Sequence, residues 1–157
     1  MELMVPLAQA AFLTVAIATH AVVGYTLGTA LFDRPVAGLA AGVAPDVDFL
    51  FPAALGWPFI HRGITHTLFV GGLTAGVVAY RDRRTALAVA AAYGSHLLLD
   101  TTTPKGVPFL SPLVETAYHF DPGTTGHSLV PTVALWMCCL GVLRLRRDSE
   151  DSPLDII

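Results

Sequence analysis

The chain of 157 residues is long enough for one domain, and its composition is not that of a soluble protein. Hydrophobic residues make up 54% and charged residues 13%, whereas soluble chains carry about 25% charged residues. The formal net charge of −3 is small. The sequence has two basic clusters, at residues 80–84 and 144–147, and neither is surrounded by the further basic and aromatic residues of a nucleic-acid-binding face. We therefore expect an integral membrane protein with no nucleic-acid partner.

The apolar stretches predict an all-α membrane bundle of about four transmembrane helices plus a broken or re-entrant helix. The first span, residues 5–32, is long enough to cross a bilayer with tilt. In residues 36–55, two prolines and two carboxylates favour a helix that breaks or turns back at "PDVD" over a clean span. The remaining spans are expected at 64–80, 85–99 and 128–143.

Residues 101–127 are rich in Pro, Gly and Thr, and they predict a long loop with one short helix at most. Residues 1–147 then form a single membrane-embedded domain, followed by a disordered acidic tail at 148–157. Three GxxxG pairs, which permit close contact between helices, are Gly24/Gly28, Gly38/Gly42 and Gly72/Gly76. The oligomeric state does not follow from them.

Two basic clusters predict the orientation of the chain. "YRDRR" (80–84) ends the second expected span and "RLRR" (144–147) ends the last one. Because basic flanks of membrane spans face the cytoplasm, we expect a multi-pass plasma-membrane protein with both termini in the cytoplasm. The ionisable residues of the second and third spans then fall in the outer half of the membrane.

Ionisable residues within a membrane protein are functional candidates, because their burial is costly unless they are satisfied. The candidates here are His20, Asp46, Asp48, His61, Arg62, His66, His96 and Asp100. Imidazoles and carboxylates without lysine form the ligand set of zinc or a similar divalent ion. We predict one or two such ions, with every candidate except Arg62 as a ligand, and no site for an organic cofactor.

Spacing supports this prediction at two places. "HLLLD" puts His96 and Asp100 four residues apart, on one face of a helix, although Asp100 could simply accept a hydrogen bond from His96. In "PDVD", Asp46 and Asp48 can point to one centre from a turn, although Asp is also a favoured helix cap.

"HRGITH" places His61 and His66 five residues apart, which would separate them on a continuous helix. Gly63 allows the chain to turn, and Thr65 is expected to cap the helix that follows. The Arg62 guanidinium suits a phosphate or carboxylate, or anchors the chain at the lipid headgroups. His20, alone on its span, could equally be a hydrogen-bonded structural residue.

The long loop holds further candidates whose roles stay open. Glu115, His119, Asp121 and His127 could supply ligands to another ion. "ETAYH" would place Glu115 and His119 on one face only if a short helix forms between Pro112 and Pro122.

The stretches "THAVVGYTLG", "PDVDFL", "HRGITHT" and "GSHLLLDTTTPKGVPFLSP", in this order, resemble the YdjM-like family of membrane-bound, metal-dependent hydrolases. That family is in turn similar to the zinc-dependent phospholipase C and P1 nuclease group, helical enzymes that cleave phosphoesters. The resemblance implies that His96 and Asp100 are a His-x-x-x-Asp pair whose Asp bridges two ions. It also implies a loop aspartate at Asp46 or Asp48, a histidine at His61 or His66, and an early histidine at His20. The group's further His, His and Glu, and its amino-terminal ligand, have no counterpart here.

We therefore expect a membrane-embedded, metal-dependent hydrolase that cleaves phosphoesters, lipid or lipid-linked ones included, with a metal-activated water. Asp46 or Asp48 would orient or deprotonate that water, and Arg62 would bind the substrate anion. Membrane lipids are the expected partners. The alternative is a non-enzymatic membrane metal-binding or scaffold protein, whose structural metal site would be closed.

Overall fold

The computed structural model describes residues 4–151 and is all-helical over that range, with no β-strand among them. Its five α-helices are α1 (Met4–Phe32), α2 (Pro35–Val43), α3 (Leu68–Ala79), α4 (Arg83–Thr101) and α5 (Leu129–Glu150). Three short 3₁₀ helices are η1 (Ala44–Leu50), η2 (Ala53–Leu55) and η3 (Ile64–His66). The predicted all-α fold class is confirmed.

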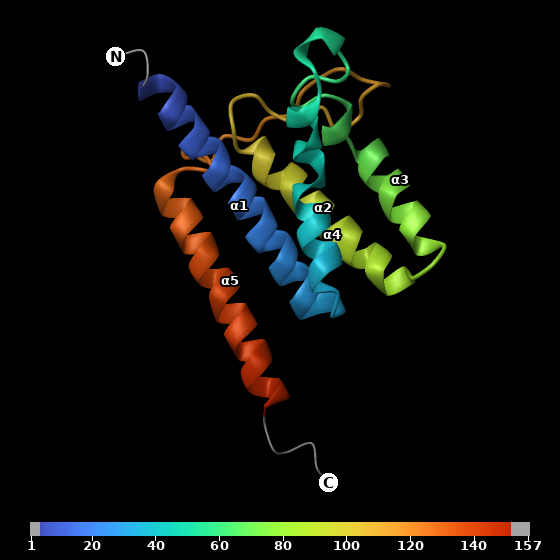
Figure 1. Cartoon of the computed structure of the whole chain (residues 1–157), viewed down its shortest axis with the longest axis vertical. Helices are drawn as coiled ribbons and strands as arrows, with labels where there is room; N and C mark the ends of the chain where they lie inside the picture. The colour runs from blue at the N-terminus through green and yellow to red at the C-terminus, as the bar shows by residue number, and fades with distance from the viewer. Residues whose placement is uncertain (1–3, 152–157) are drawn as a thin grey trace.

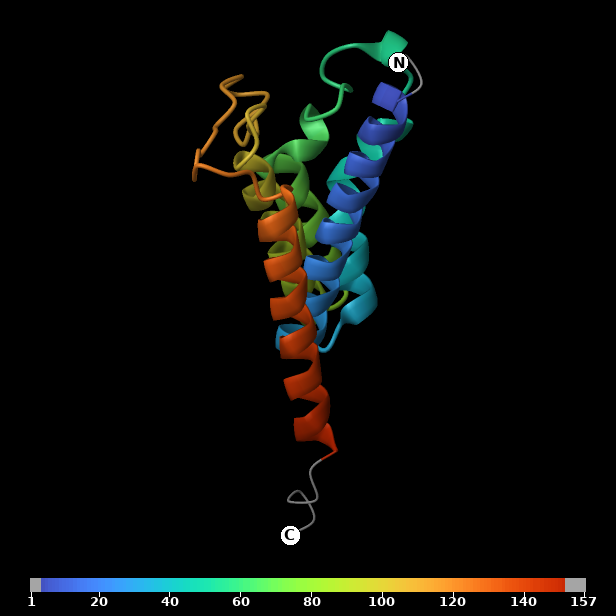
Figure 2. The same ribbon diagram turned by 90° about the vertical axis from the view of Figure 1, so that its left-hand side faces the viewer.

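The helices run alternately up and down between two ends of an elongated bundle (Figure 1). One end, here called the loop end, holds η1, η2, η3 and the connection between α4 and α5, as both views show (Figures 1 and 2). The opposite end, here called the arginine end, holds the α1–α2 and α3–α4 turns and the end of α5. The Met4 end of α1 lies at the loop end, so the two described ends of the chain lie at opposite ends of the bundle.

Glycines set the distance between α1 and α2. A Cβ added to Gly28 would lie 2.9 Å from the Cα of Gly38, and one added to Gly38 would lie 2.8 Å from the Cα of Gly28. Such contacts leave no room for a side chain, so these two GxxxG pairs serve packing within the chain. A Cβ on Gly72 or Gly76 would meet nothing within 4 Å.

The stretch around "PDVD" is a broken helix. Pro35 starts α2 in the first turn, where its missing N–H is harmless. Pro45 lacks the N–H that would continue the α-helical ladder, and the backbone tightens from α2 into the 3₁₀ helix η1. The chain runs from the arginine end to the loop end over α2 and η1 without turning back (Figure 1). Of the two predicted forms, the broken helix is therefore the one present.

The other predicted spans agree with the helices apart from their ends. α3 begins four residues after the expected position, because η3 and Thr67 precede it. α4 covers the whole expected span at 85–99. α5 continues to Glu150, past the expected domain boundary at 147, and residues 152–157 of the expected tail lie outside the described residues. Residues 102–128, all of them described, contain no helix, as expected of a long loop.

α4 is the central helix and packs against α1, α2 and α3. Its buried positions include Val89, Ala92, Tyr93 and Leu97. α5, which packs mainly on α1, has only Thr132 and Cys139 buried. Its exposed apolar side chains are Leu129, Val130, Val133, Met137, Leu140, Val142 and Leu145. A surface this apolar is typical of contact with lipid. Within the described residues, α1 from Leu7 and α5 are long and apolar enough to cross a membrane.

Seven of the nine Lys and Arg residues belong to the arginine end. They are Arg34, Arg81, Arg83, Arg84, Arg144, Arg146 and Arg147. Arg34 Nε donates to Asp82 Oδ2 at 3.2 Å, which joins the α1–α2 turn to the α3–α4 turn. An Arg146 N–H donates to the carbonyl oxygen of Ala30 at 3.1 Å, which joins α5 to the last turns of α1. The two remaining cations, Arg62 and Lys105, lie at the loop end.

Candidate metal centre

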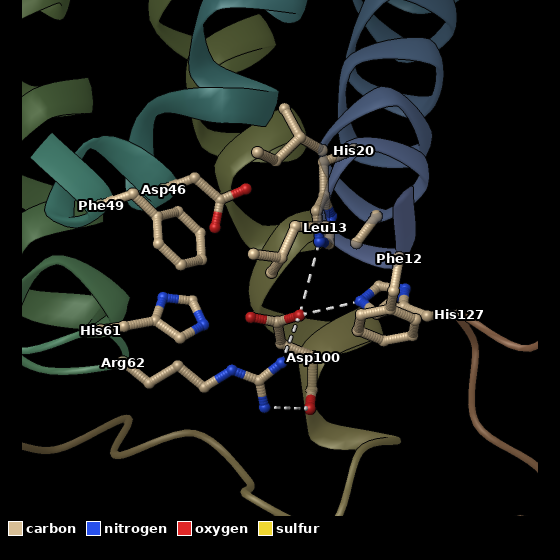
Figure 3. A pocket seen from close by; sticks show the side chains of 11 residues that line it. Phe12, Leu13, His20, Asp46, Phe49, His61, Arg62, Asp100 and His127 are labelled. Atoms are coloured by element: carbon tan, nitrogen blue, oxygen red, sulfur yellow. Dashed lines mark hydrogen bonds and ion pairs between the residues drawn. The ribbon is translucent and has the colours of Figure 1, made fainter. Parts of the chain in front are cut away.

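Side chains from five separate parts of the sequence converge at the loop end around one pocket (Figure 3). They come from α1, η1, the segment of η3 and the loop before it, the last turns of α4, and His127, two residues before α5. All seven predicted ligands lie in this cluster, and all are buried or half-buried. They are His20, Asp46, Asp48, His61, His66, His96 and Asp100. The predicted convergence of these residues at one end is thus present in the structure.

His96 and Asp100 share one face of α4, as their spacing predicts. The Nε2 atom of His96 lies 3.5 Å from Oδ2 of Asp100. On the other side of the ring, Nδ1 of His96 lies 2.7 Å from the carbonyl oxygen of Gly42, at the end of α2. A carbonyl oxygen only accepts, so Nδ1 carries the proton and Nε2 of the neutral ring presents its lone pair to the cluster.

His66 is oriented in the same way by a carboxylate. Its Nδ1 lies 3.1 Å from Oδ2 of Asp48, which accepts the ring proton. Its Nε2 then faces Nε2 of His96 at 3.2 Å and Oδ2 of Asp100 at 3.4 Å. In the neutral forms of both rings, two imidazole lone pairs and a carboxylate oxygen therefore point at one another.

Asp46 supplies a fourth acceptor. Its Oδ1 lies 3.8 Å from Nε2 of His66 and 3.8 Å from Nε2 of His96. Acceptor atoms this close repel one another unless a metal ion or a proton lies among them. Tetrahedral ligands about 2.0–2.1 Å from a zinc ion are about 3.3 Å apart from each other, close to the separations seen here. These residues fit a divalent ion of the zinc type.

Asp48, predicted as a ligand and catalytic residue, has a different position from Asp46. Its two oxygens accept from Nδ1 of His61 at 3.1 Å, Nδ1 of His66 at 3.1 Å, the backbone N–H of Arg62 at 2.9 Å and the Thr65 hydroxyl at 2.9 Å. Three of these donors face Oδ2, whereas Oδ1 accepts only from His61. Asp48 thus orients two histidines, which is the usual arrangement behind histidine metal ligands, and its predicted role as a ligand itself stays a prediction.

The second oxygen of Asp100 faces another group of donors. Oδ1 lies 3.4 Å from Nε2 of His20, 3.2 Å from Nε2 of His127 and 2.9 Å from an N–H of Arg62 (Figure 3). Nδ1 of His20 and Nδ1 of His127 are buried without a hydrogen-bond partner in the described structure. The protonated nitrogen of these two rings is therefore not set by the protein. Each ring can donate to Asp100 through Nε2, and in the other tautomer its Nε2 would be free to bind an ion.

Arg62 is held by the protein more tightly than its predicted role suggests. Its NH1 donates to the carbonyl oxygens of Asp100 and Gly106, both at 3.2 Å, and to the Thr103 hydroxyl. Only Nε of the buried guanidinium lacks a partner. The guanidinium thus fixes the end of α4 and places a positive charge against Asp100. Its predicted contact with a substrate anion stays a prediction.

The backbone of "HRGITH" is strained where it presents these side chains. Arg62 has a φ of 63°, which is a left-handed backbone conformation. In residues other than glycine, this conformation costs about 1–3 kcal/mol. At Gly63, an added Cβ would collide with the carbonyl oxygens of Pro58 and Ile60. The predicted turn at Gly63 is therefore confirmed.

The predicted cap of α3 is wrong, because Thr67, not Thr65, accepts the N–H of Val70 at the start of this helix. Thr65 donates to Asp48 instead.

His61 lines the open side of the cluster. Its ring stacks on Phe49, with centroids 4.1 Å apart, and its side chain is 28% exposed. Because Nδ1 points to Asp48, Nε2 is the atom it can offer to Asp46 and His66, with which it forms a second possible ion group. Lys105 lies beside it and donates to the His61 carbonyl oxygen at 2.8 Å.

Of the four open candidates in the long loop, only His127 joins the cluster. Burial lowers the pKa of the His127 imidazole and favours its neutral form. Glu115, His119 and Asp121 are exposed, and no helix forms at 115–119, where the described chain is extended. Spacing could not have singled out His127, since its partners His20 and Asp100 are far away in the sequence. Its position directly before the last apolar helix was the one available sign.

The fold and the cluster together define a class of all-helical membrane proteins with a buried centre of imidazoles and carboxylates. The model of the YdjM inner membrane protein family matches residues 15–151, and the chain belongs to this family. The matched range contains every residue of the cluster, from His20 to His127. No curated protein and no solved structure matches the chain. The similarity to the phospholipase C and P1 nuclease group stays a prediction.

Proposed function

We propose that the chain is a membrane-embedded, metal-dependent hydrolase of phosphoesters. The observation that carries this proposal is the convergence of four acceptor atoms, from Asp46, His66, His96 and Asp100, within 3.2–3.8 Å along the measured pairs. A divalent ion bound there supplies Lewis-acid chemistry and a water of lowered pKa. Hydrolysis breaks the P–O bond to the ester's alcohol. Hydroxide from the water forms the new bond to phosphorus, and the alcohol leaves with a proton on its oxygen.

The protein side chains divide the remaining tasks. His66, His96 and Asp100 would hold the ion, which leaves a fourth position for water. Asp46 lines the pocket and, unlike Asp48, is not engaged by four donors, so we assign it the acceptance of a proton from that water. His61 and His127 border the same pocket and can hydrogen-bond to phosphate oxygens. Lys105 donates to the carbonyl oxygen of His61 beside the pocket, and its charge favours an anion there. A catalytic site stays open to substrate, and this cluster borders a pocket, which favours an enzyme over a closed structural metal site.

We further propose that α1, α2 continued by η1, α3, α4 and α5 each pass through the membrane, with the arginine end in the cytoplasm. The C-terminal end of α5 then faces the cytoplasm, as predicted. The Met4 end of α1 would lie on the outer side with the metal centre, because it is at the loop end (Figures 1 and 2). This replaces the prediction of two cytoplasmic termini, which required an even number of crossings.

The test begins with metal content. The wild-type protein, purified in mild detergent, should contain near-stoichiometric zinc or a similar ion, and a His96→Ala, Asp100→Ala double variant should lose it. His119→Ala is the matched control, because His119 is exposed and outside the cluster. Metal-loaded wild type should hydrolyse bis(p-nitrophenyl) phosphate, and the double variant should not.

Two results would overturn the proposal. Absence of metal from gently purified wild type would leave the cluster as a network of hydrogen bonds. Bound metal without hydrolysis of soluble or lipid phosphoesters would favour a structural metal site in a scaffold protein.

A further inference from the structure

An apolar groove adjoins the candidate metal centre on the outer face of the bundle. It lies between α1 and η1 and has a volume of about 580 Å³. Its walls include Leu13 and Ile17 of α1 and Val47 and Leu50 of η1. Leu50 is 80% exposed, so the groove opens away from the bundle.

The groove is continuous with the pocket of the metal centre. Four residues line both: Leu13, Ile17, Asp46 and Phe49. Asp46 is the polar residue at the junction, and its carboxylate reaches the histidines of the cluster. A molecule in the groove would therefore meet the cluster at one end and apolar walls over the rest of its length.

The surroundings of the groove indicate its occupant. α1, which forms one wall, is long and apolar enough to span a membrane. In the proposed membrane placement, hydrocarbon lies beside this wall. The α1 residues of the wall, Leu13 and Ile17, are four positions apart, which is about 6 Å of helix. Arg62 lines the metal pocket, and Lys105 donates to the carbonyl oxygen of His61, another residue of that lining. An apolar channel that opens to lipid and ends at cations and metal ligands suits an amphiphile with an anionic head.

We infer that the groove holds the hydrocarbon chain of the substrate, so that the protein acts on a long-chain lipid phosphate drawn sideways from the bilayer. The inference rests on the proposed hydrolase function and specifies its substrate class. The phosphate lies against the cluster, and the first part of the chain lies between Ile17 and Val47. A short-chain phosphoester fills the same head site and lacks the contact with the apolar walls.

The test compares two esters and two variants in lipid nanodiscs. Val47→Trp narrows the groove at a residue that does not line the metal pocket. Val133→Trp adds the same ring to an exposed apolar position on α5, away from the groove. We expect wild type to prefer a C16 alkyl phosphate over its C4 analogue at least tenfold in kcat/KM. Val47→Trp should lower this ratio at least tenfold, and Val133→Trp should leave it unchanged.

A second measurement does not depend on turnover. A photoreactive C16 phosphate lipid in nanodiscs should label wild-type residues 13–17 and 47–50 above the exposed faces of α3 and α5. Two results would overturn the groove inference: equal labelling of all exposed apolar faces, or an unchanged ratio of the C16 and C4 kcat/KM values in Val47→Trp. In either case, hydrolysis of the C4 ester would still support the proposed function. Specific labelling without hydrolysis of either ester would overturn the function and keep the groove as a lipid-phosphate site.

Discussion

At the level of single residues, Asp46 and Asp48 differ in role although they are two positions apart. Asp46 faces two histidines through Oδ1, whereas Asp48 is surrounded by donors. We expect Asp46→Asn to abolish metal binding or turnover. Asp48→Asn should weaken zinc affinity about 10–100-fold, the usual effect of losing a residue that orients a ligand.

Chelator competition with the purified protein measures both affinities. Glu115→Gln, an exposed carboxyl in the long loop, is the control and should bind as wild type does. Equal loss of affinity in the two aspartate variants would contradict the assignment of different roles.

The residue types of the cluster were predictable from sequence, and most of their roles were not. Buried ionisable groups stand out in an apolar chain, which is why all seven predicted ligands lie together. Whether a carboxylate binds an ion or orients its neighbours depends on the donors around it. The donors of Asp48 come from the loop before η3 and from His66, and only the folded backbone brings them there. His127 was left open for the same reason.

At the level of elements, glycines decide how α1 and α2 pack. Gly38→Ala should destabilise the protein by about 1–3 kcal/mol, because the new methyl group would collide with the backbone of α1. Gly76→Ala is the matched control, since its Cβ would meet nothing within 4 Å and alanine favours a helix. Thermal unfolding in detergent compares the two. A Gly38→Ala variant as stable as Gly76→Ala would contradict the close contact.

The cap of α4 predicts a pH dependence of stability. Hydrogen bonds from the Thr85 hydroxyl and the Arg84 backbone N–H lower the pKa of Asp82 to about 2. A carboxyl group whose pKa is lower in the folded state contributes stability above its unfolded pKa of about 3.9, and this contribution is lost as pH falls through the folded value.

Between pH 4 and pH 2, the melting temperature of wild type should therefore fall more steeply than that of Asp82→Asn. Asparagine keeps the capping geometry without the charge. Melting curves in detergent across this range provide the test, with Asp148→Asn on α5 as the control. Parallel curves for wild type and Asp82→Asn would show that the cap does not titrate.

Helix positions were more predictable than helix ends. Apolar runs located α1, α4 and α5, and Pro45 located the break after α2. The start of α3 was misplaced, because Thr65 and Thr67 are both good caps and the choice between them depends on Asp48, which engages Thr65.

At the level of the whole molecule, charge separates the two ends of the bundle. If the arginine end is cytoplasmic, a cysteine at Ser149 should react with a membrane-impermeant maleimide only after cells are permeabilised. A cysteine at Thr124, in the loop before α5, should react in intact cells. Both variants need Cys138 and Cys139 replaced by Ala. Labelling of position 149 in intact cells would reverse the orientation, and labelling of both positions would contradict a membrane-spanning α5.

The break after α2 also bears on the chemistry of the cluster. In an uninterrupted α-helix, the Gly42 carbonyl would accept the N–H of Asp46, four residues on. In η1 the hydrogen bonds close over three residues instead, so that N–H is drawn to Val43. The Gly42 oxygen is left for the ring of His96. The end of α2 therefore determines which nitrogen of His96, on α4, carries the proton. The lone pair that His96 presents to the cluster thus depends on the change from α-helix to 3₁₀ helix after α2.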